Sequence, residues 1–300
     1  MTEQKRPTFG SRHLSDEHDV FSHNAWDDVE WSDEQSEEAN TIIEKQYENR
    51  MSDTKWETLK SDLPSAWNRF YDIHENKFFK DRQWLFTEYP ELLFSSSSSN
   101  TDPRQLMTIL EVGCGVGNSI FPIIRTNNIN EHSHIFLYCC DYSSTAIDIL
   151  KQNVDYNTKY CHGFVYDITS FNPMPFEENS LDFILMIFVL SAIHPSQHEQ
   201  VIKNLIKYLK PGHGKLLFRD YGLYDMAQLR FKNDKCIEKN LYARSDGTLT
   251  YFFQQDELDQ LFTRNGLVKE QNLIDRRLQV NRSKQLKMYR VWLQCKYIRK

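Results

Sequence analysis

The sequence predicts an α/β fold: a seven-stranded, mostly parallel sheet with helices on both faces, preceded by an N-terminal extension. Three observations lead to this prediction. Beyond residue 100, apolar runs of strand length alternate with helical patterns, which is typical of a parallel sheet buried on both faces. The first of these runs ends in a glycine-rich turn. The chain has 300 residues, 40% of them hydrophobic, which is enough for one large core.

The extension begins with an acidic arm, residues 1–60. Positions 14–48 carry twelve acidic residues and one basic residue, yet the arm also holds Phe21, Trp26 and Trp31. Solvated tails rarely contain so many large aromatic side chains. We therefore expect the tryptophans to pack onto the rest of the protein, with nearby carboxylates meeting basic side chains.

The next part of the extension, residues 61–100, is predicted to be a helical segment. A helix is also expected before it, over about 32–50. In the sequence AWNRFYDIH the following aromatic side chains fall on one helical face: Trp67, Phe70, Tyr71 and His74. The five-serine run at 95–99 is typical of a surface loop, so the main domain is expected over 101–300.

Within the main domain, five apolar runs and two later segments account for the predicted strands. The five runs are LMTILEVG, HIFLYCCD, CHGFVYD, LDFILMIFVLSAI and GKLLFRDYG. Helices are expected over 117–125, 144–152, 195–212 and 253–265. The two later segments, GLVKEQNLID and KMYRVWLQCKY, are predicted to form a hairpin at one edge of the sheet.

The sequence ILEVGCGVGN is the most specific motif in the chain. It follows a predicted strand and opens a helix, and its glycines let a ligand approach the backbone closely. A dinucleotide-binding turn would need glycine where this chain has Asn118. A turn of Gly113, Gly115 and Gly117 preceded by Glu111 resembles the first motif of class I S-adenosylmethionine-dependent methyltransferases. This resemblance implies a Rossmann-like class I fold and S-adenosylmethionine as the cofactor.

Two further carboxylates end the next two strands. Asp141 can accept the ribose hydroxyls of a bound nucleoside, and Asp167 can accept the exocyclic amine of adenine. Ile168 and Ile187 are candidates to enclose the adenine ring. Each carboxylate alone is more often a solvated strand end. Three acids in order after three successive strands, behind such a turn, favour a cofactor site.

The composition excludes several other classes of protein. No apolar run approaches the ~20 residues of a membrane span, and the N-terminus lacks the apolar core of a signal peptide. The six cysteines show neither a CxxC pair nor a metal-ligand spacing, which indicates reduced and mostly buried thiols and no metal site. We therefore expect a cytoplasmic protein without a membrane partner.

The charge distribution is uneven. The net charge is −6, which on average disfavours nucleic acid, but positions 276–300 hold nine basic residues and no acidic one. A phosphate backbone responds to this local field rather than to the average. On charge alone, an RNA-contacting face and an ordinary solvated surface both remain open.

The sequence LSAIHP follows the fourth apolar run. Methyltransferases that act on adenine amines carry an aspartate or asparagine and a second proline at this position, and this chain has neither. A ring nitrogen is therefore the better target, because it needs orientation and charge stabilisation rather than a base. His194 is a candidate base or a cap for the following helix, and the cap is favoured.

Longer strings extend the resemblance to most of the chain. HENKFFKDRQWLFTEYPEL, LEVGCGVGN, IFVLSAIHP and LFRDYGLYDMAQLRF resemble the eukaryotic tRNA 3-methylcytidine methyltransferases. FGSRHL and VFSHNAWDDVEW are similar to the branch that acts on threonine tRNAs. The resemblance implies additional cofactor contacts from Trp67 and Tyr71, so the helical segment 61–100 is expected to cover the cofactor and contact RNA. The family commonly has histidine after FFKDR, where this chain has Gln83, so an obligatory histidine base is not expected there.

The N3 atom of cytidine lies on its Watson–Crick edge, so the base must be unpaired or flipped to react. Phe78, Phe79 and Trp84 offer stacking surfaces, and Lys80 and Arg82 offer phosphate contacts, although an ordinary packing segment would look the same. The C-terminal block supplies further candidates for phosphate contacts: Arg276, Arg277, Arg282, Lys284 and Lys287.

The sequence FRDYG ends the fifth strand, at the sheet edge where the cofactor is expected. Arg219 is a candidate to hold O2 of the base or a phosphate, and Asp220 is a candidate to balance the charge that develops on the ring. The alternative is that these two side chains pair with each other.

These inferences predict an S-adenosylmethionine-dependent methyltransferase that forms N3-methylcytidine at nucleotide 32 of the tRNA anticodon loop, in threonine tRNAs. The rival hypotheses are a methyltransferase of a protein or small molecule, and a catalytically silent tRNA-binding subunit. tRNA is the expected partner, and the sequence leaves open a helper protein or a tRNA synthetase as a further one.

Overall fold

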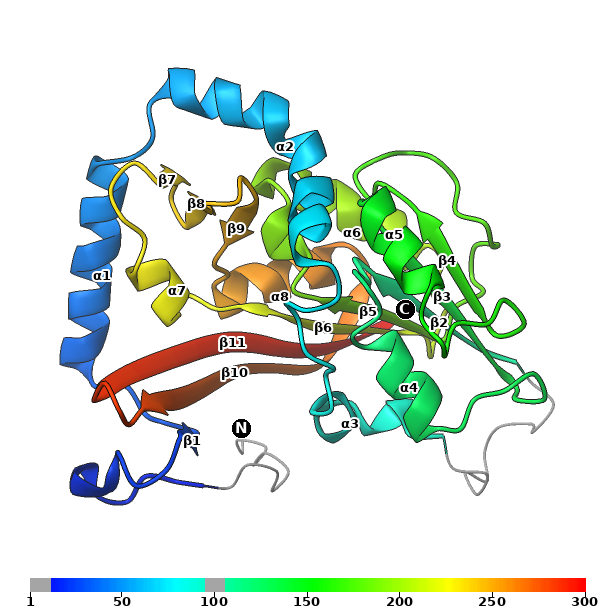
Figure 1. The fold of residues 1–300 in the computed structure, drawn as a ribbon, viewed down its shortest axis with the longest axis horizontal. Helices are drawn as coiled ribbons and strands as arrows, with labels where there is room; N and C mark the ends of the chain where they lie inside the picture. Colours follow the sequence, from blue (N-terminus) through cyan, green and yellow to red (C-terminus); the bar gives the residue numbers. More distant parts are fainter. Residues whose placement is uncertain (1–11, 95–105) are drawn as a thin grey trace.

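The computed structural model describes residues 12–94 and 106–300. Residues 1–11 and the serine run at 95–99 lie outside the described residues. The centre of the fold is an eight-stranded sheet with the order β1-β10-β11-β6-β5-β2-β3-β4 (Figure 1). The α/β prediction with a mostly parallel core is therefore confirmed.

The parallel half of the sheet contains the five predicted runs. Its strands are β2 (Met107–Val112), β3 (Ile135–Asp141), β4 (Cys161–Val165), β5 (Phe183–Ile187) and β6 (Lys215–Tyr221). The strands β3, β2 and β5 are neighbours, with β4 outside β3 and β6 outside β5. Their carboxyl ends therefore meet along one edge, where ligands bind in open α/β sheets.

The last two strands form the predicted hairpin, and the N-terminal arm extends it. β11 (Leu286–Arg299) pairs antiparallel with β6, and β10 (Leu267–Asn281) pairs with β11. The arm adds β1 (Ala25–Asp27), which pairs antiparallel with β10. This eighth strand was not predicted, because three residues of an acidic segment carry no strand pattern.

Helices cover both faces of the sheet, as predicted. α4 (Ile120–Thr126) and α5 (Ser144–Lys151) share one buried cluster with Leu137 and Leu185. α6 (His198–Ile206) and α8 (Gln255–Arg264) share the other with Ile184 and Phe218. The apolar side chains alternate between these clusters along each strand, as the two-residue period of a strand requires.

The N-terminal helices lie outside these layers. α1 (Asp33–Glu48) begins at Ser32, whose hydroxyl accepts from the backbone of Gln35 in a capping box. α2 (Asp53–His74) follows after a short turn and crosses the carboxyl edge of the parallel strands (Figure 1). The expected boundary at residue 60 thus falls inside one continuous helix.

Smaller elements complete the fold. A separate antiparallel sheet, which was not predicted, consists of β7 (Cys236–Glu238), β8 (Leu241–Ala243) and β9 (Leu249–Tyr251). The remaining short helices are η1 (Glu17–Asp19), α3 (Leu85–Glu88), η2 (Pro90–Leu92), η3 (Leu190–Ala192), η4 (Pro195–Gln197) and α7 (Met226–Leu229).

Two expectations about the chain as a whole can be compared with the structure. All six cysteines are buried with free thiols, as expected. None of the helices in the described part of the chain is long and apolar enough to cross a membrane.

Candidate active site

A cavity of about 600 Å³ lies at the carboxyl edge of the parallel strands. The glycine turn, α2, the segment 79–84 and the ends of β3, β5 and β6 contribute to its lining. Eight of the residues predicted to bind the cofactor line it: Trp67, Tyr71, Gly113, Gly115, Asp141, Asp167, Ile168 and Ile187. The structure thus brings most of the predicted cofactor site together.

The glycine turn depends on backbone conformations that other residues rarely adopt. Gly113, Gly115 and Gly117 have φ angles of +60°, +53° and +94°. A Cβ atom on Gly113 would lie 2.5 Å from Val189, and one on Gly115 would lie 2.5 Å from the hydroxyl oxygen of Tyr71. The close neighbours of these two glycines are therefore protein side chains, in addition to any ligand. Gly117 packs on α4 and does not line the cavity.

Asp141, at the end of β3, holds the turn in place. The backbone N–H groups of Gly115 and Ser143 donate to its two carboxylate oxygens over 2.8 and 2.9 Å. Burial raises the pKa of Asp141 to about 6, although these backbone hydrogen bonds oppose the rise. Each carboxylate oxygen retains a second lone pair that can accept a ribose hydroxyl.

Asp167 occupies the corresponding place after β4. One of its carboxylate oxygens accepts the backbone N–H and the hydroxyl of Thr169 over 2.8 and 2.7 Å. This local turn fixes the carboxylate at the cavity, which Ile168 and Tyr142 also line. The arrangement is compatible with recognition of an amine on an aromatic ring.

Glu111 lies beneath the turn and does not line the cavity. Its side chain is fully buried, and Arg82 reaches it with a nitrogen–oxygen distance of 3.1 Å. The other carboxylate oxygen, Oε2, is buried without a hydrogen-bond partner. Burial raises the pKa of Glu111 to about 7, despite the opposing charge of Arg82.

Aromatic side chains of α2 form the roof of the cofactor end. Trp67 and Tyr71 line the cavity, and Phe70 packs edge-on against both rings. Phe79 joins the same cluster from the following segment. The helical spacing of these residues in the sequence therefore produces one aromatic surface above the glycine turn.

The residues of the segment expected to contact RNA lie in different environments in the structure. Phe79, Lys80, Arg82 and Trp84 line the cavity. Phe78 does not line it but is 54% exposed and packs against Phe70. Arg82 also donates to the hydroxyl of Ser119 over 2.7 Å. Its bonds to Glu111 and Ser119 place Arg82 beside the cofactor turn, and its contact with an RNA phosphate stays a prediction.

His194 lines the cavity and caps η4. Its Nδ1 accepts the backbone N–H of Ser196, and its ring stacks on Trp56 with centroids 5.8 Å apart. The favoured structural role of this histidine thus agrees with its contacts.

Arg219 and Asp220 do not pair with each other, because neighbouring residues of a strand point to opposite faces. Asp220 is fully buried, accepts the backbone N–H of Ser191 over 2.9 Å and does not line the cavity. Burial raises its pKa to about 6. Both residues are enclosed in the protein, so the structure does not support the expectation that they touch the base.

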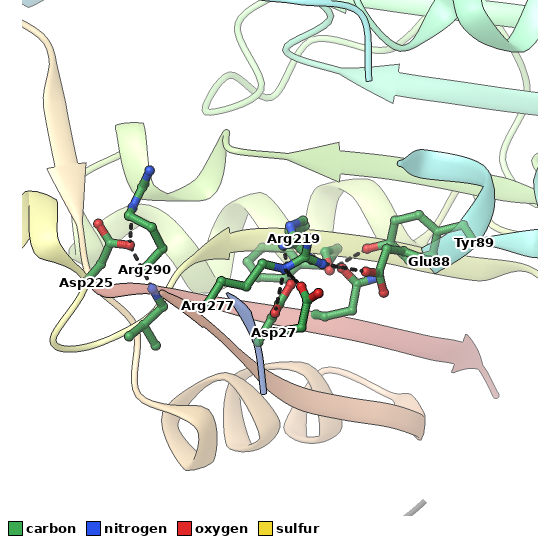
Figure 2. A network of polar contacts seen from close by, with 11 residues as sticks. Asp27, Glu88, Tyr89, Arg219, Asp225, Arg277 and Arg290 are labelled. Carbon is green, nitrogen blue, oxygen red and sulfur yellow. Dashed lines mark hydrogen bonds and ion pairs between the residues drawn. The ribbon is translucent and has the colours of Figure 1, made fainter. Parts of the chain in front are cut away.

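Arg219 belongs to a buried network beside the cavity (Figure 2). Its guanidinium donates to Asp275 over 2.5 Å and to the side-chain oxygen of Gln294 over 2.6 Å. It also lies 4.8 Å from the ring centroid of Trp84 and 4.9 Å from that of Trp292. These two tryptophans line the cavity, so Arg219 supports its wall from behind.

The predicted basic cluster does not line the cavity. Arg277 forms ion pairs with Asp27, Glu88 and Asp275 at distances of 3.5, 3.2 and 3.1 Å (Figure 2). Its role is therefore to join the arm to the sheet, contrary to the expectation of a phosphate contact.

The other members of the cluster differ from Arg277. Arg276 is half-buried on β10. Arg282, Lys284 and Lys287 are exposed around the β10–β11 turn, where Arg282 also donates to the backbone oxygen of Ser22.

The tryptophans of the arm pack on the domain as expected. Trp26 is buried beside Leu278, and Trp31 stacks on Tyr224 with ring centroids 5.7 Å apart. Asp27 meets Arg277, which agrees with the expectation that acidic residues of the arm meet basic side chains.

Several lining residues were missed by sequence reasoning: Lys60, Phe188, Tyr221, Arg244, Thr248, Arg290 and Trp292. Phe188 follows β5 with a φ of +59°, an unusual conformation for a large side chain. Its neighbour in the cavity is Tyr221, with ring centroids 5.0 Å apart. Phe188 and Tyr221 could have been found from their positions at strand ends, and Arg290 and Trp292 from the basic C-terminal block, whereas Lys60 lies inside α2 without such a signal.

The cofactor end suits S-adenosylmethionine, whose sulfonium and ammonium groups are positive. The carboxylates of Asp141 and Asp167 line this end, and the unpaired oxygen of Glu111 lies beneath it. Asp141 would hold the ribose, Asp167 the adenine, and Trp67 and Tyr71 would cover the ligand. The residues present therefore fit this cofactor.

Comparisons with known proteins agree with this geometry. Residues 81–272 match a family model described as a methyltransferase domain. A tRNA N(3)-cytidine methyltransferase of Danio rerio is 50% identical, covering 98% of this chain and 90% of that protein. The tRNA(Thr) (cytosine(32)-N(3))-methyltransferase of Saccharomyces cerevisiae is 41% identical, covering 96% of this chain and 45% of that protein.

A solved structure, the PH0226 protein from Pyrococcus horikoshii OT3, has a TM-score of 0.53 at 16% identity, covering 77% of this chain and 99% of that one. It shows the fold alone, whereas the two sequence relatives extend over nearly the whole chain. The methyl donor is S-adenosylmethionine, and the chain belongs to the family of tRNA N(3)-cytidine methyltransferases.

Proposed function

We propose that this chain transfers the methyl group of S-adenosylmethionine to N3 of the cytidine at position 32 in the anticodon loop of threonine tRNAs. The observation that carries this proposal is the 41% identity over 96% of the chain to the yeast enzyme named for this reaction. The cavity supports it, because one end carries carboxylates for the cofactor and the other carries aromatic and basic side chains for a nucleotide.

The chemistry requires orientation more than proton transfer. S-adenosylmethionine supplies a methyl group on a positively charged sulfur atom. N3 of neutral cytosine has a free lone pair, so the protein's task is to remove the base from its stack and aim N3 at that methyl group. Phe188, Tyr221 and Trp84 are the aromatic lining residues that can hold the base in this way. His194, which serves as a cap, is not needed as a base.

Arg219 and Asp220 are assigned positioning roles. Arg219 keeps the rings of Trp84 and Trp292 in place through its position beside both. Asp220 fixes the loop after β5 by accepting the N–H of Ser191, a residue that lines the cavity. Neither role requires contact with the base.

tRNA is the proposed partner, and the exposed aromatic ring of Phe78 and the amine of Lys80 stand where an entering strand can meet them. Arg282, Lys284 and Lys287 offer a second, more distant basic surface. The proposed location is the cytoplasm. A helper protein or tRNA synthetase would add contacts to the RNA outside the cavity.

The function is tested with the purified chain, S-adenosylmethionine and threonine tRNA taken from cells that lack this enzyme, so that other modifications are present. Nucleoside mass spectrometry is expected to find N3-methylcytidine in that tRNA and none in a C32U version. Equal methylation of the C32U version would contradict the assigned position. Binding of tRNA without binding of S-adenosylhomocysteine would instead identify a silent RNA-binding subunit.

A further inference from the structure

Acidic and basic side chains line the cavity from different elements of the fold. Its acidic lining residues, Asp141 and Asp167, both belong to the cofactor end. Arg244 and Arg290 line it from other elements, Arg244 just after β8 and Arg290 on β11. S-adenosylmethionine has one anionic group, its α-carboxylate, so the cofactor alone does not account for both arginines. An anionic group beside the base would explain them.

Arg290 is held in one orientation from two sides. Its Nε donates to Asp225 over 2.9 Å (Figure 2). Its guanidinium carbon also lies 4.8 Å from the ring centroid of Trp292. Asp225 is itself fully buried and accepts the backbone N–H groups of Ala227 and Val291, each over 2.8 Å. The contact through Nε leaves the two terminal nitrogens of Arg290 as donors for a ligand.

The β-sheet register explains why Trp292 can support Arg290. Residues 290, 292 and 294 of β11 share one face, and Arg219 of β6 lies opposite Gln294. Trp292 is therefore placed between the guanidinium groups of Arg290 and Arg219, each within 4.9 Å of its ring centroid. Such stacking limits the rotation of a long side chain, which reduces the entropy that ligand binding must remove.

Arg244 lies over the ring of Tyr221, which is next to Trp292 in the lining of the cavity. Its guanidinium carbon lies 5.4 Å from the ring centroid of Tyr221, and Tyr221 pairs with Trp292 in the β6–β11 register. Its side chain donates one long hydrogen bond, of 3.4 Å, to the hydroxyl of Thr250. Within the described part of the chain, no carboxylate forms an ion pair with Arg244.

We propose that Arg244 and Arg290 form a clamp for the phosphate groups that flank the flipped nucleotide. Guanidinium forks match phosphate oxygens, and phosphate contacts set the register of a nucleic acid without reading its sequence. A nucleotide drawn into the cavity brings its own phosphates with it, so they must meet charge near the base. This inference rests on the proposed function and adds to it the residues that hold the backbone of the reacting nucleotide.

The first test measures the salt dependence of binding of the anticodon stem-loop by the full chain. Arg244→Gln is the cleaner variant, because Arg244 forms no ion pair in the described part of the chain, whereas Arg290 pairs with buried Asp225. The charge of Arg244 opposes the rise in the pKa of buried Asp220 without a direct contact. Arg290→Lys keeps a positive charge beside Asp225 and removes only the fork. The slope of log affinity against log salt should fall by about 0.7 in Arg244→Gln, the value for one single-strand phosphate contact. Arg290→Lys should weaken binding while keeping the slope.

The matched control is Arg264→Gln, on the solvent face of α8 and outside the cavity, whose ion pair with Glu199 is exposed. It should leave the slope unchanged. S-adenosylhomocysteine affinity should remain as in the unaltered chain for all three variants, which shows that they are folded. An unchanged slope in Arg244→Gln would overturn the clamp.

The second test leaves the protein intact and neutralises the RNA. A methylphosphonate replaces the phosphate on the 5′ or the 3′ side of the target cytidine. At least one of the two replacements should weaken binding of the RNA to the unaltered chain. The same replacement should weaken binding to Arg244→Gln or Arg290→Lys by little more, because the contact is already lost in these variants. Equal weakening of all chains would overturn the clamp and place these arginines on the base instead. The proposed function fails separately, if the unaltered chain does not methylate the unmodified stem-loop or tRNA.

Discussion

A nitrogen of Arg82 lies 3.1 Å from a carboxylate oxygen of Glu111, and this ion pair joins the segment 79–84 to the strand that enters the glycine turn. The segment is further attached by the side-chain amide of Asn118, which donates to the backbone oxygen of Phe79. The glycine turn and the segment 79–84, which lines the cavity, are thus parts of one structural unit. A substitution in either part is expected to affect the structure of the other.

Arg82→Gln should lower the free energy of unfolding by about 3 kcal/mol, because removal of one partner leaves the buried carboxylate of Glu111 uncompensated. Denaturant unfolding measures this decrease. The double variant Arg82→Gln with Glu111→Gln should recover most of it. A single variant as stable as the unaltered chain would show that the pair does not contribute.

Asp141→Ala should weaken the binding of S-adenosylhomocysteine by ~1–3 kcal/mol, since the ribose hydroxyls would be left without a buried acceptor. Isothermal titration calorimetry gives the affinity directly. Asp155→Ala, at a solvent-exposed ion pair with Arg125, is the matched control and should bind normally. An unchanged affinity in Asp141→Ala would remove Asp141 from the cofactor site.

Binding of S-adenosylhomocysteine should weaken as the pH falls through about 6, the pKa to which burial raises Asp141. The ionised carboxylate is the better acceptor, so binding favours that form and is strongest above this pH. Asp141→Asn should bind more weakly at neutral pH but show no such step. A step near pH 7 that survives in Asp141→Asn is expected from Glu111, whose pKa is about 7.

Neutralising Arg282, Lys284 and Lys287 together should lower tRNA affinity and reduce its salt slope by ~0.7–0.9 for each phosphate that is no longer neutralised by the protein. Cofactor affinity should not change, because these residues lie outside the cavity. Arg277→Gln is expected to behave differently and reduce stability, since three carboxylates pair with Arg277. A constant salt slope in the triple variant would make these three residues ordinary surface charges.

Deleting residues 1–50 should leave S-adenosylhomocysteine binding nearly intact but strongly reduce methylation of tRNA. Residues 12–50 do not line the cavity. Ion pairs connect them to its wall, from Asp27 through Arg277 and Asp275 to Arg219. Trp26→Ala should reproduce part of this reduction, whereas Glu37→Ala on the exposed face of α1 should not. A truncated chain that methylates tRNA at the full rate would exclude a role of the arm in substrate use.

The sequence predicted the parallel strands and the cofactor end because both follow from short patterns. Strand-length apolar runs indicate the sheet, and a turn such as Gly113–Gly117 has few other uses. Asp141 and Asp167 follow these runs directly, so their position in the fold is determined once the order of strands is known.

The substrate end could not be predicted in the same way. Arg244 follows β8 of the small sheet and Arg290 lies on β11 of the main sheet, so only the tertiary structure places both on one cavity, and neither stands in a recognisable motif. Arg219 and Arg277 were assigned to RNA because their type suits phosphate, but their burial beside Asp275 is a tertiary property. Residue type indicated a function, and only the packing showed which arginines face the cavity.

The short strand β1 has a consequence for how this protein behaves in concentrated solution. β10 is 15 residues long, and β1 pairs with its residues 277–279, while the backbone groups of residues 276 and 280 also bond to the arm. An uncovered sheet edge is a template on which another copy can pair. Proteolytic removal of the first thirty or so residues would uncover it, and we expect the cleaved chains to self-associate through this edge.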